Sequence, residues 1–185
     1  MKWPALLFVG WGIVLVQSTL GRVLIFERFV TGPIGPDMMA ALLVLLGLNG
    51  KKTADVCCGA MVLGLMMDLM NAGGASGLTR VGPMMFAYGL GVFLLQQIRE
   101  AVDRDSLLPV AVLAGLLTLV THGVWMILQY SLADGGSISA LMGSLVQVLF
   151  SAVYTAAVVP WVYWLLRPAT VWILPYQPAD RRSRR

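Results

Sequence analysis

The chain has 185 residues, of which 58% are hydrophobic and 12% charged, and its mean hydropathy is +0.81. Soluble domains carry about 25% charged residues, so this composition excludes a soluble globular protein and predicts an integral membrane protein. The net charge of +4 is spread between apolar runs, apart from a basic stretch at residues 181–185. Such a stretch beside a membrane span lies against anionic lipid headgroups and sets orientation, so we expect membrane lipid, and no nucleic acid, as a partner.

Long gaps between charged residues predict six membrane-spanning helices, since a span takes about 17–25 residues. They cover residues 3–20, 36–48, 54–71, 83–98, 107–130 and 138–159, followed by a basic cytoplasmic tail at 167–185. The second is short and is expected where the bilayer is thin or with little tilt. The first is expected to be retained, because residues 17–20 offer no small-x-small cleavage site. Residues 23–30 are too short and too charged to cross, which predicts an interfacial segment.

Prolines and glycines mark the predicted helix ends. Prolines fall at or near the start of three spans, at Pro36, Pro83 and Pro109, where a missing backbone N–H costs nothing. Pro160 is expected to end or kink the sixth span. Asn49-Gly50 and residues 73–77 predict tight turns in which glycine adopts a positive φ.

The distribution of basic residues predicts the orientation. With the N-terminus inside, only Arg22, Arg28 and Arg80 of the thirteen Lys and Arg residues lie outside. Cytoplasmic segments carry the excess of basic residues in membrane proteins, so both termini are expected in the cytoplasm. Long apolar runs without alternation argue against a barrel. The predicted fold is one all-α domain of six transmembrane helices in a single bundle.

Two acids, Asp37 and Asp68, fall in apolar runs on the same side of the predicted membrane. Asp37 follows Pro36, where an acid in the first helical turn favours the helix dipole. Asp68 lies toward the C-terminal end of its helix, where the dipole disfavours an anion, and a central Asp costs about 2.5–3.5 kcal/mol to insert. Asp68 therefore requires a partner, for which Arg80 is a candidate, or it lies exposed at the interface.

Other polar residues within the spans predict packing contacts and not catalysis. His122 and Gln147 fall mid-span, Gln17 ends the first span, and Gln96 and Gln97 lie near the end of the fourth. Gln17, Gln96 and Gln97 are expected to hydrogen-bond between helices. We expect an interhelical hydrogen bond from His122, because a lone His lacks the ligand count that a metal site requires. Ser76 lies in a loop without the Gly-x-Ser-x-Gly spacing of a hydrolase. We therefore expect no enzyme activity, no cofactor and no metal.

Several of these features together resemble the bacterial rod shape-determining MreD family. The resemblance rests on Gln17-Ser18, Pro36-Asp37, Asn49-Gly50, Gly64 with Asp68, and a glycine loop that ends at Gly77-Leu78. It covers mainly residues 10–95. It implies a six-helix fold similar to the substrate-binding S-components of energy-coupling vitamin transporters.

The resemblance also implies a function in cell elongation at the bacterial inner membrane. An MreD-like protein is a non-enzymatic scaffold that accompanies MreC and supports lateral peptidoglycan synthesis with MreB, RodA and its penicillin-binding transpeptidase. Small residues spaced four apart, such as Ala152 and Ala156, fit close helix packing within the bundle or against a partner. The alternative is a substrate-binding subunit of a vitamin-type transporter, with Asp37, Asp68 and His122 as ligand contacts.

Overall fold

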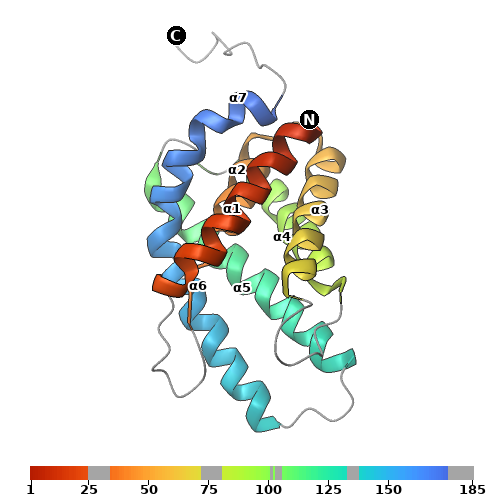
Figure 1. The fold of residues 1–185 in the computed structure, drawn as a ribbon, viewed down its shortest axis with the longest axis vertical. Helices are drawn as coiled ribbons and strands as arrows, with labels where there is room; N and C mark the ends of the chain where they lie inside the picture. The colour runs from red at the N-terminus through yellow and green to blue at the C-terminus, as the bar shows by residue number, and fades with distance from the viewer. Residues whose placement is uncertain (25–33, 72–80, 101, 103–105, 133–137, 175–185) are drawn as a thin grey trace.

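The computed structural model describes residues 1–24, 34–71, 81–100, 102, 106–132 and 138–174, and these residues are helical without a β-strand. The helices are α1 (Trp3–Leu24), α2 (Met39–Asn49), α3 (Thr53–Asn71), α4 (Pro83–Ile98), α5 (Leu107–Leu132), α6 (Ile138–Leu166), the 3₁₀ turn η1 (Arg167–Ala169) and α7 (Thr170–Ile173). Figure 1 shows α7 bent across one end of the bundle, beside the start of α1. The predicted all-helical fold is confirmed for this part of the chain.

Among the described residues, three helical segments are long and apolar enough to cross a membrane: Thr53–Met70, Leu107–Gln129 and Met142–Ile173. Trp3–Thr19, Met39–Asn49 and Pro83–Ile98 are shorter apolar helices. The outer surface is also apolar, as expected when lipid and not water surrounds a protein. Phe8 on α1, for example, is 78% exposed. The chain is thus a helical membrane protein by the length and composition of its helices.

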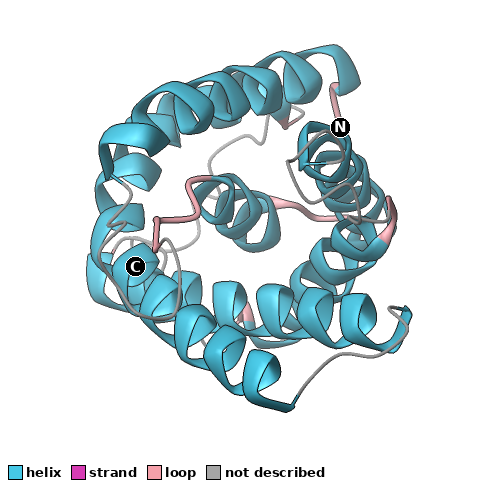
Figure 2. Cartoon of the chain, turned by 60° about the horizontal axis from the view of Figure 1, so that its bottom comes forward, coloured by secondary structure: helices cyan, strands magenta, loops and turns pink. Residues whose placement is uncertain are grey.

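Helix α2 lies inside the bundle. Its residues 39–48 are all buried, and it packs against α1, α3, α4, α5 and α6, so that one helix runs within a ring of others (Figure 2). A helix that is apolar all round is a buried one. At about 1.5 Å per residue, its 11 residues fall well short of the hydrocarbon thickness of about 30 Å. Both ends of α2 therefore lie within protein, where their backbone groups require partners.

Small residues allow the outer helices to approach closely. A side chain at Gly115 of α5 would lie 3.1 Å from the Ala156 Cβ and 3.3 Å from the Ala152 carbonyl oxygen of α6. The predicted spacing of small residues on these two helices therefore forms their contact. Gly10 of α1 similarly faces Leu63 of α3.

Four local predictions differ from the structure. Helix α1 extends to Leu24, and α2 starts at Met39, so Asp37 precedes the helix and does not lie in its first turn. Helix α6 continues through Pro160 to Leu166, so the proline does not end it at the predicted residue 159. Gly50 has a φ of −75°, not a positive one; glycine is required there because a Cβ would collide with Val56 and the Leu46 carbonyl. Of the predicted interfacial segment 23–30, residues 23 and 24 belong to α1. Residues 25–30, the turn at 73–77 and the basic stretch at 181–185 lie outside the described residues.

Candidate functional site

Asp37 caps the buried N-terminus of α2. Its Oδ1 accepts a hydrogen bond from the Met39 N–H at 3.0 Å, and its carbonyl accepts one from the Ala40 N–H at 3.2 Å. Its own N–H donates to Thr155 Oγ1 of α6 at 2.9 Å. The Asp37 side chain satisfies one of the orphan N–H groups that a helix start leaves. Asp37 thus acts on the start of α2 from a position just outside the helix.

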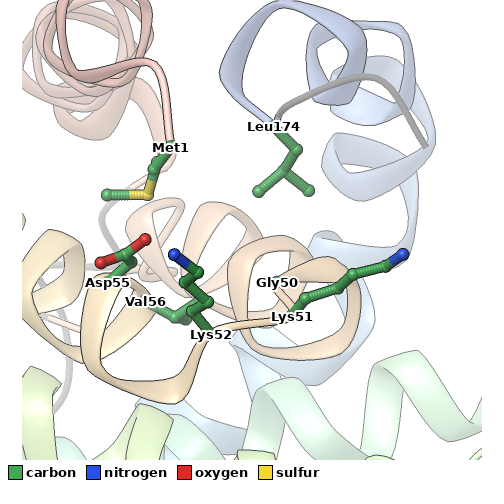
Figure 3. A pocket seen from close by; sticks show the side chains of 7 residues that line it. All are labelled: Met1, Gly50, Lys51, Lys52, Asp55, Val56 and Leu174. Atoms are coloured by element: carbon green, nitrogen blue, oxygen red, sulfur yellow. The ribbon is translucent and has the colours of Figure 1, made fainter.

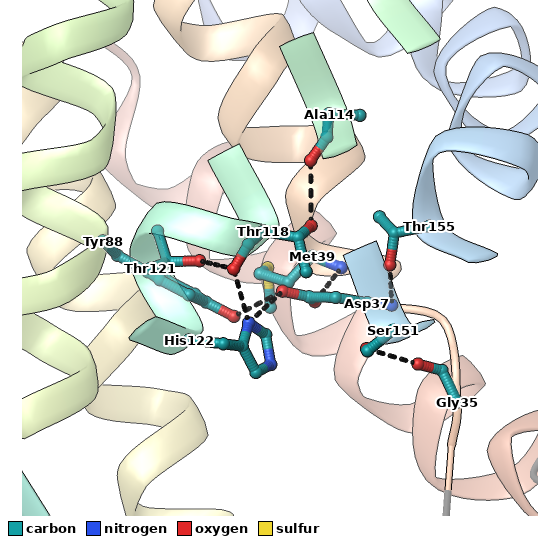
Figure 4. A network of polar contacts seen from close by, with 10 residues as sticks. All are labelled: Gly35, Asp37, Met39, Tyr88, Ala114, Thr118, Thr121, His122, Ser151 and Thr155. Atoms are coloured by element: carbon teal, nitrogen blue, oxygen red, sulfur yellow. Dashed lines mark hydrogen bonds and ion pairs between the residues drawn. The ribbon is translucent and has the colours of Figure 1, made fainter. Parts of the chain in front are cut away.

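A polar cluster surrounds the Asp37 carboxylate (Figure 4). The Tyr88 hydroxyl of α4, itself fully buried, donates to Asp37 Oδ2 at 3.2 Å. His122 Nδ1 of α5 lies 4.0 Å from the same oxygen. Ser151 of α6 donates to the Gly35 carbonyl at 2.8 Å. The segment that leads into α2 is therefore held by α4 and α6, with the His122 ring beside it.

His122 makes its hydrogen bond within its own helix. Its Nδ1 lies 3.2 Å from the Thr118 carbonyl oxygen, and because a carbonyl only accepts, Nδ1 carries the hydrogen. The separation of 4.0 Å from Asp37 is longer than a hydrogen bond. The expected interhelical hydrogen bond of His122 is thus not formed among the described residues, and the ring contributes a neighbouring dipole, or a charge when it is protonated.

Asp68 caps a second helix, α4, from α3. Its Oδ2 accepts hydrogen bonds from three backbone N–H groups: Gly82 at 2.9 Å, Met84 at 3.0 Å and Met85 at 3.2 Å. The carboxylate is 3% exposed and lies at the N-terminus of α4, where the helix dipole favours an anion. The N-terminus of α4 is therefore the partner that the buried charge of Asp68 requires. Arg80, the expected partner, lies outside the described residues.

Gly64, one helical turn before Asp68, allows α4 to come within reach of that carboxylate. A Cβ at Gly64 would lie 2.5 Å from the Met84 carbonyl oxygen and 2.6 Å from the Met85 Cα. Both are backbone atoms, which cannot move aside as a flexible side chain can. Gly82, which opens α4, has a φ of 123°, a conformation that residues with a side chain rarely adopt. Gly64 and Asp68 together place the start of α4 against α3.

The C-terminus of α2 is capped from α4 by two side chains. Gln96 Nε2 donates to the carbonyls of Gly47 at 2.6 Å and Gly50 at 3.2 Å. The Arg99 guanidinium donates to the Gly50 carbonyl at 2.5 Å and to Gln96 Oε1 at 2.8 Å. A cation is favourable at this end of a helix. Side chains therefore cap both buried ends of α2: Asp37, just before the helix, at its N-terminus, and Gln96 and Arg99 from another segment at its C-terminus.

The remaining predicted residues lie apart from these caps. Gln17 on α1 has a buried Oε1 that accepts no hydrogen bond from the described residues. Gln147 is half-buried on α6. Gly77 lies outside the described part of the chain. Within that part, no group of three or more His, Cys, Asp or Glu side chains is placed to hold a metal ion.

Three of the residues that make these contacts were missed from the sequence: Tyr88, Arg99 and Thr155. They gave no signal, because a tyrosine or threonine within a span, or an arginine just after one, is unremarkable. Gln96, a polar residue inside an apolar run, makes the interhelical hydrogen bond expected of it. In comparisons with known proteins, no family model, no curated protein and no solved structure matches the chain.

Proposed function

We propose that the chain is a multi-pass scaffold subunit of the MreD type in the bacterial inner membrane. In this proposal it is not an enzyme; it binds MreC directly and supports lateral peptidoglycan synthesis and cell shape in the rod complex. MreB, RodA and its penicillin-binding transpeptidase belong to the same complex. Six helices cross the membrane, and both ends of the chain lie in the cytoplasm.

The observation that supports a scaffold is the role of the residues that resemble MreD. Asp37 caps α2, Asp68 caps α4, and Gly64 allows α3 and α4 to touch. Each of these residues acts on a helix end or a helix contact. Residues kept for chemistry would instead converge on a reacting group. A signature made of caps and close contacts favours a protein whose task is to hold a shape.

One contact supports the proposed topology. The Lys2 N–H donates to the Ile173 carbonyl at 2.8 Å, so the start of α1 and the end of α7 lie at the same end of the bundle. The α2–α3 turn with Lys51 and Lys52 borders the same pocket as Met1 and Leu174. Basic residues from two segments, Lys2 at the start of α1 and Lys51 with Lys52 in the α2–α3 turn, thus lie at one end, as the positive-inside rule favours for the cytoplasmic side.

The test is co-purification of the full chain with MreC from membranes in a mild detergent. We expect MreC to be retained by the wild type. A photo-crosslinking residue placed at exposed positions should then identify the bound face, with Phe8 on α1 compared with Leu116 on α5. Crosslinks to MreC confined to one of these faces would support a defined docking surface. A chain that never retains MreC and gives no crosslink would contradict the proposal.

One observation favours the alternative, a substrate-binding transporter subunit. The Asp37 carboxylate, the Tyr88 hydroxyl and the His122 ring lie together inside the bundle, a combination that can recognise a small polar ligand. A vitamin panel in a thermal-shift assay separates the two functions. Stabilisation by one vitamin that is lost in Tyr88→Phe would establish the alternative, whereas no response across the panel would remove it.

A further inference from the structure

A small pocket opens at the turn between α2 and α3 (Figure 3). It has a volume of about 210 Å³ and is lined by Met1, Gly50, Lys51, Lys52, Asp55, Val56 and Leu174. Three of these side chains are charged and three are apolar. Pockets for drug-sized ligands hold about 300–1,000 Å³, so this one suits a smaller polar group with an apolar neighbour.

The charged side chains that line this pocket do not pair with one another. Lys51 and Lys52 are exposed and Asp55 is half-buried, and no ion pair joins them in the described segments. Figure 3 shows Lys51 extending to one side of the pocket, whereas Lys52 and Asp55 lie on the other. The pocket thus offers the Lys51 cation on one side and the Asp55 anion, with Lys52 beside it, on the other, to a ligand that carries both signs of charge.

Exposed tryptophans indicate that the pocket lies at the level of lipid headgroups. Trp3 at the start of α1 is 40% exposed. Trp164, near the end of α6, is 66% exposed, and Trp172, within α7, is 71% exposed. The hydrogen bond between Lys2 and Ile173 holds these two segments side by side. Tryptophan concentrates at the membrane–water interface. The pocket, which Met1 and Leu174 border, lies at this same end.

We propose that this pocket binds the zwitterionic phosphoethanolamine headgroup of a membrane phospholipid. The phosphate accepts a hydrogen bond from the Lys51 ammonium group on one side of the pocket, and the lipid ammonium pairs with the Asp55 carboxylate on the other. Val56 and Leu174 contact the glycerol and the first acyl carbons. A purely anionic headgroup would leave Asp55 facing a like charge, which costs free energy. The inference requires only that the chain lies in a membrane. It therefore does not depend on whether the chain binds MreC.

The experiment measures lipid binding to the delipidated full chain in detergent, by native mass spectrometry with phosphatidylethanolamine and phosphatidylglycerol. We expect phosphatidylethanolamine to bind more tightly. Asp55→Asn should weaken that lipid about two- to fivefold, the factor expected for one solvent-accessible ion pair, and leave phosphatidylglycerol unaffected. The double variant Lys51→Gln with Lys52→Gln should weaken both lipids. Glu100→Gln, a charge change at an exposed residue that does not line the pocket, should change neither.

Three results would overturn the proposal. Phosphatidylglycerol that binds as tightly as phosphatidylethanolamine would indicate only a basic surface. An equal effect of Glu100→Gln and Asp55→Asn would show that the pocket is not the site. Glycerophosphoethanolamine carries the same headgroup without acyl chains, and if it bound as tightly as the lipid, the ligand would be a soluble molecule. Thermal unfolding of each variant without lipid checks that the fold is retained.

Discussion

Replacing each capping aspartate by asparagine should have unequal effects, because the two carboxylates have different partners. Asp37 Oδ1 accepts from a backbone N–H, but Oδ2 faces the Tyr88 hydroxyl, which can rotate to accept from an amide NH₂. The partners of Asp68 among the described residues are all backbone N–H groups, which only donate. In Asp68→Asn the NH₂ group either faces these donors or turns away and leaves one oxygen to serve three of them.

The magnitude follows from the bonds lost. A hydrogen bond to a charged group contributes about 1.5–3 kcal/mol, and a buried donor left unpaired costs about 1–3 kcal/mol. Asp68→Asn keeps one acceptor, so we expect a loss of about 1–3 kcal/mol. Asp37→Asn keeps a cap and a hydroxyl partner, and asparagine caps about as well as aspartate. We expect it to cost less than about 1 kcal/mol.

Thermal unfolding in detergent measures both variants. For a chain of this size, 1 kcal/mol corresponds to about 2–4 °C. Asp68→Asn should therefore lower Tm by about 2–12 °C, and Asp37→Asn by less than about 4 °C. Asp68→Ala, which removes both acceptors, should be worse than Asp68→Asn. Equal shifts for the two asparagine variants, or a larger shift for Asp37→Asn, would refute the assignment of Asp68 as the cap of α4.

Three further substitutions test the helix contacts by the same Tm measurement. Gly64→Ala should lower the free energy of unfolding by about 1–3 kcal/mol, because the new Cβ would collide with the backbone of α4. Gly123→Ala is the control: nothing lies within 4 Å of a Cβ there, so it should be neutral or stabilise by up to about 1 kcal/mol. Equal Tm values for the two variants would contradict the close contact of α3 and α4. Gln96→Leu removes the amide that donates to two carbonyls at the C-terminal end of α2 and should cost about 1–3 kcal/mol of stability. The control Gln97→Leu, at an exposed neighbouring residue, should have little effect. A larger loss for Gln97→Leu than for Gln96→Leu would rule out Gln96 as the C-terminal cap of α2. Tyr88→Phe removes one donor to the Asp37 carboxylate and should lower stability by about 1.5–3 kcal/mol. If the two groups act together, this loss of stability should largely disappear when Tyr88→Phe is made in the Asp37→Ala variant.

The helices themselves could be predicted because the bilayer restricts the backbone conformations that a chain can adopt. Backbone groups in lipid must be satisfied within the segment, so long gaps between charges already indicate helices, and α4 begins and ends where the sequence predicts. Asp37 could be recognised for a similar reason. A cap of this kind bonds the N–H two residues further along the chain, and such local contacts are visible in the sequence.

The position of α2 and the partners of Asp68 and Gln96 depended on the tertiary structure. The sequence predicts residues 39–48 to be part of one more short span. A helix that is apolar all round has no single apolar face to indicate which neighbours surround it. Asp68 bonds N–H groups 14 to 17 residues away, and Gln96 bonds carbonyls 46 and 49 residues away. The sequence by itself determined that Asp68 required a partner, since an unpaired charge in an apolar helix is costly. Only the packing of α3 against α4, close enough to need Gly64, decided that the partner is the start of a helix.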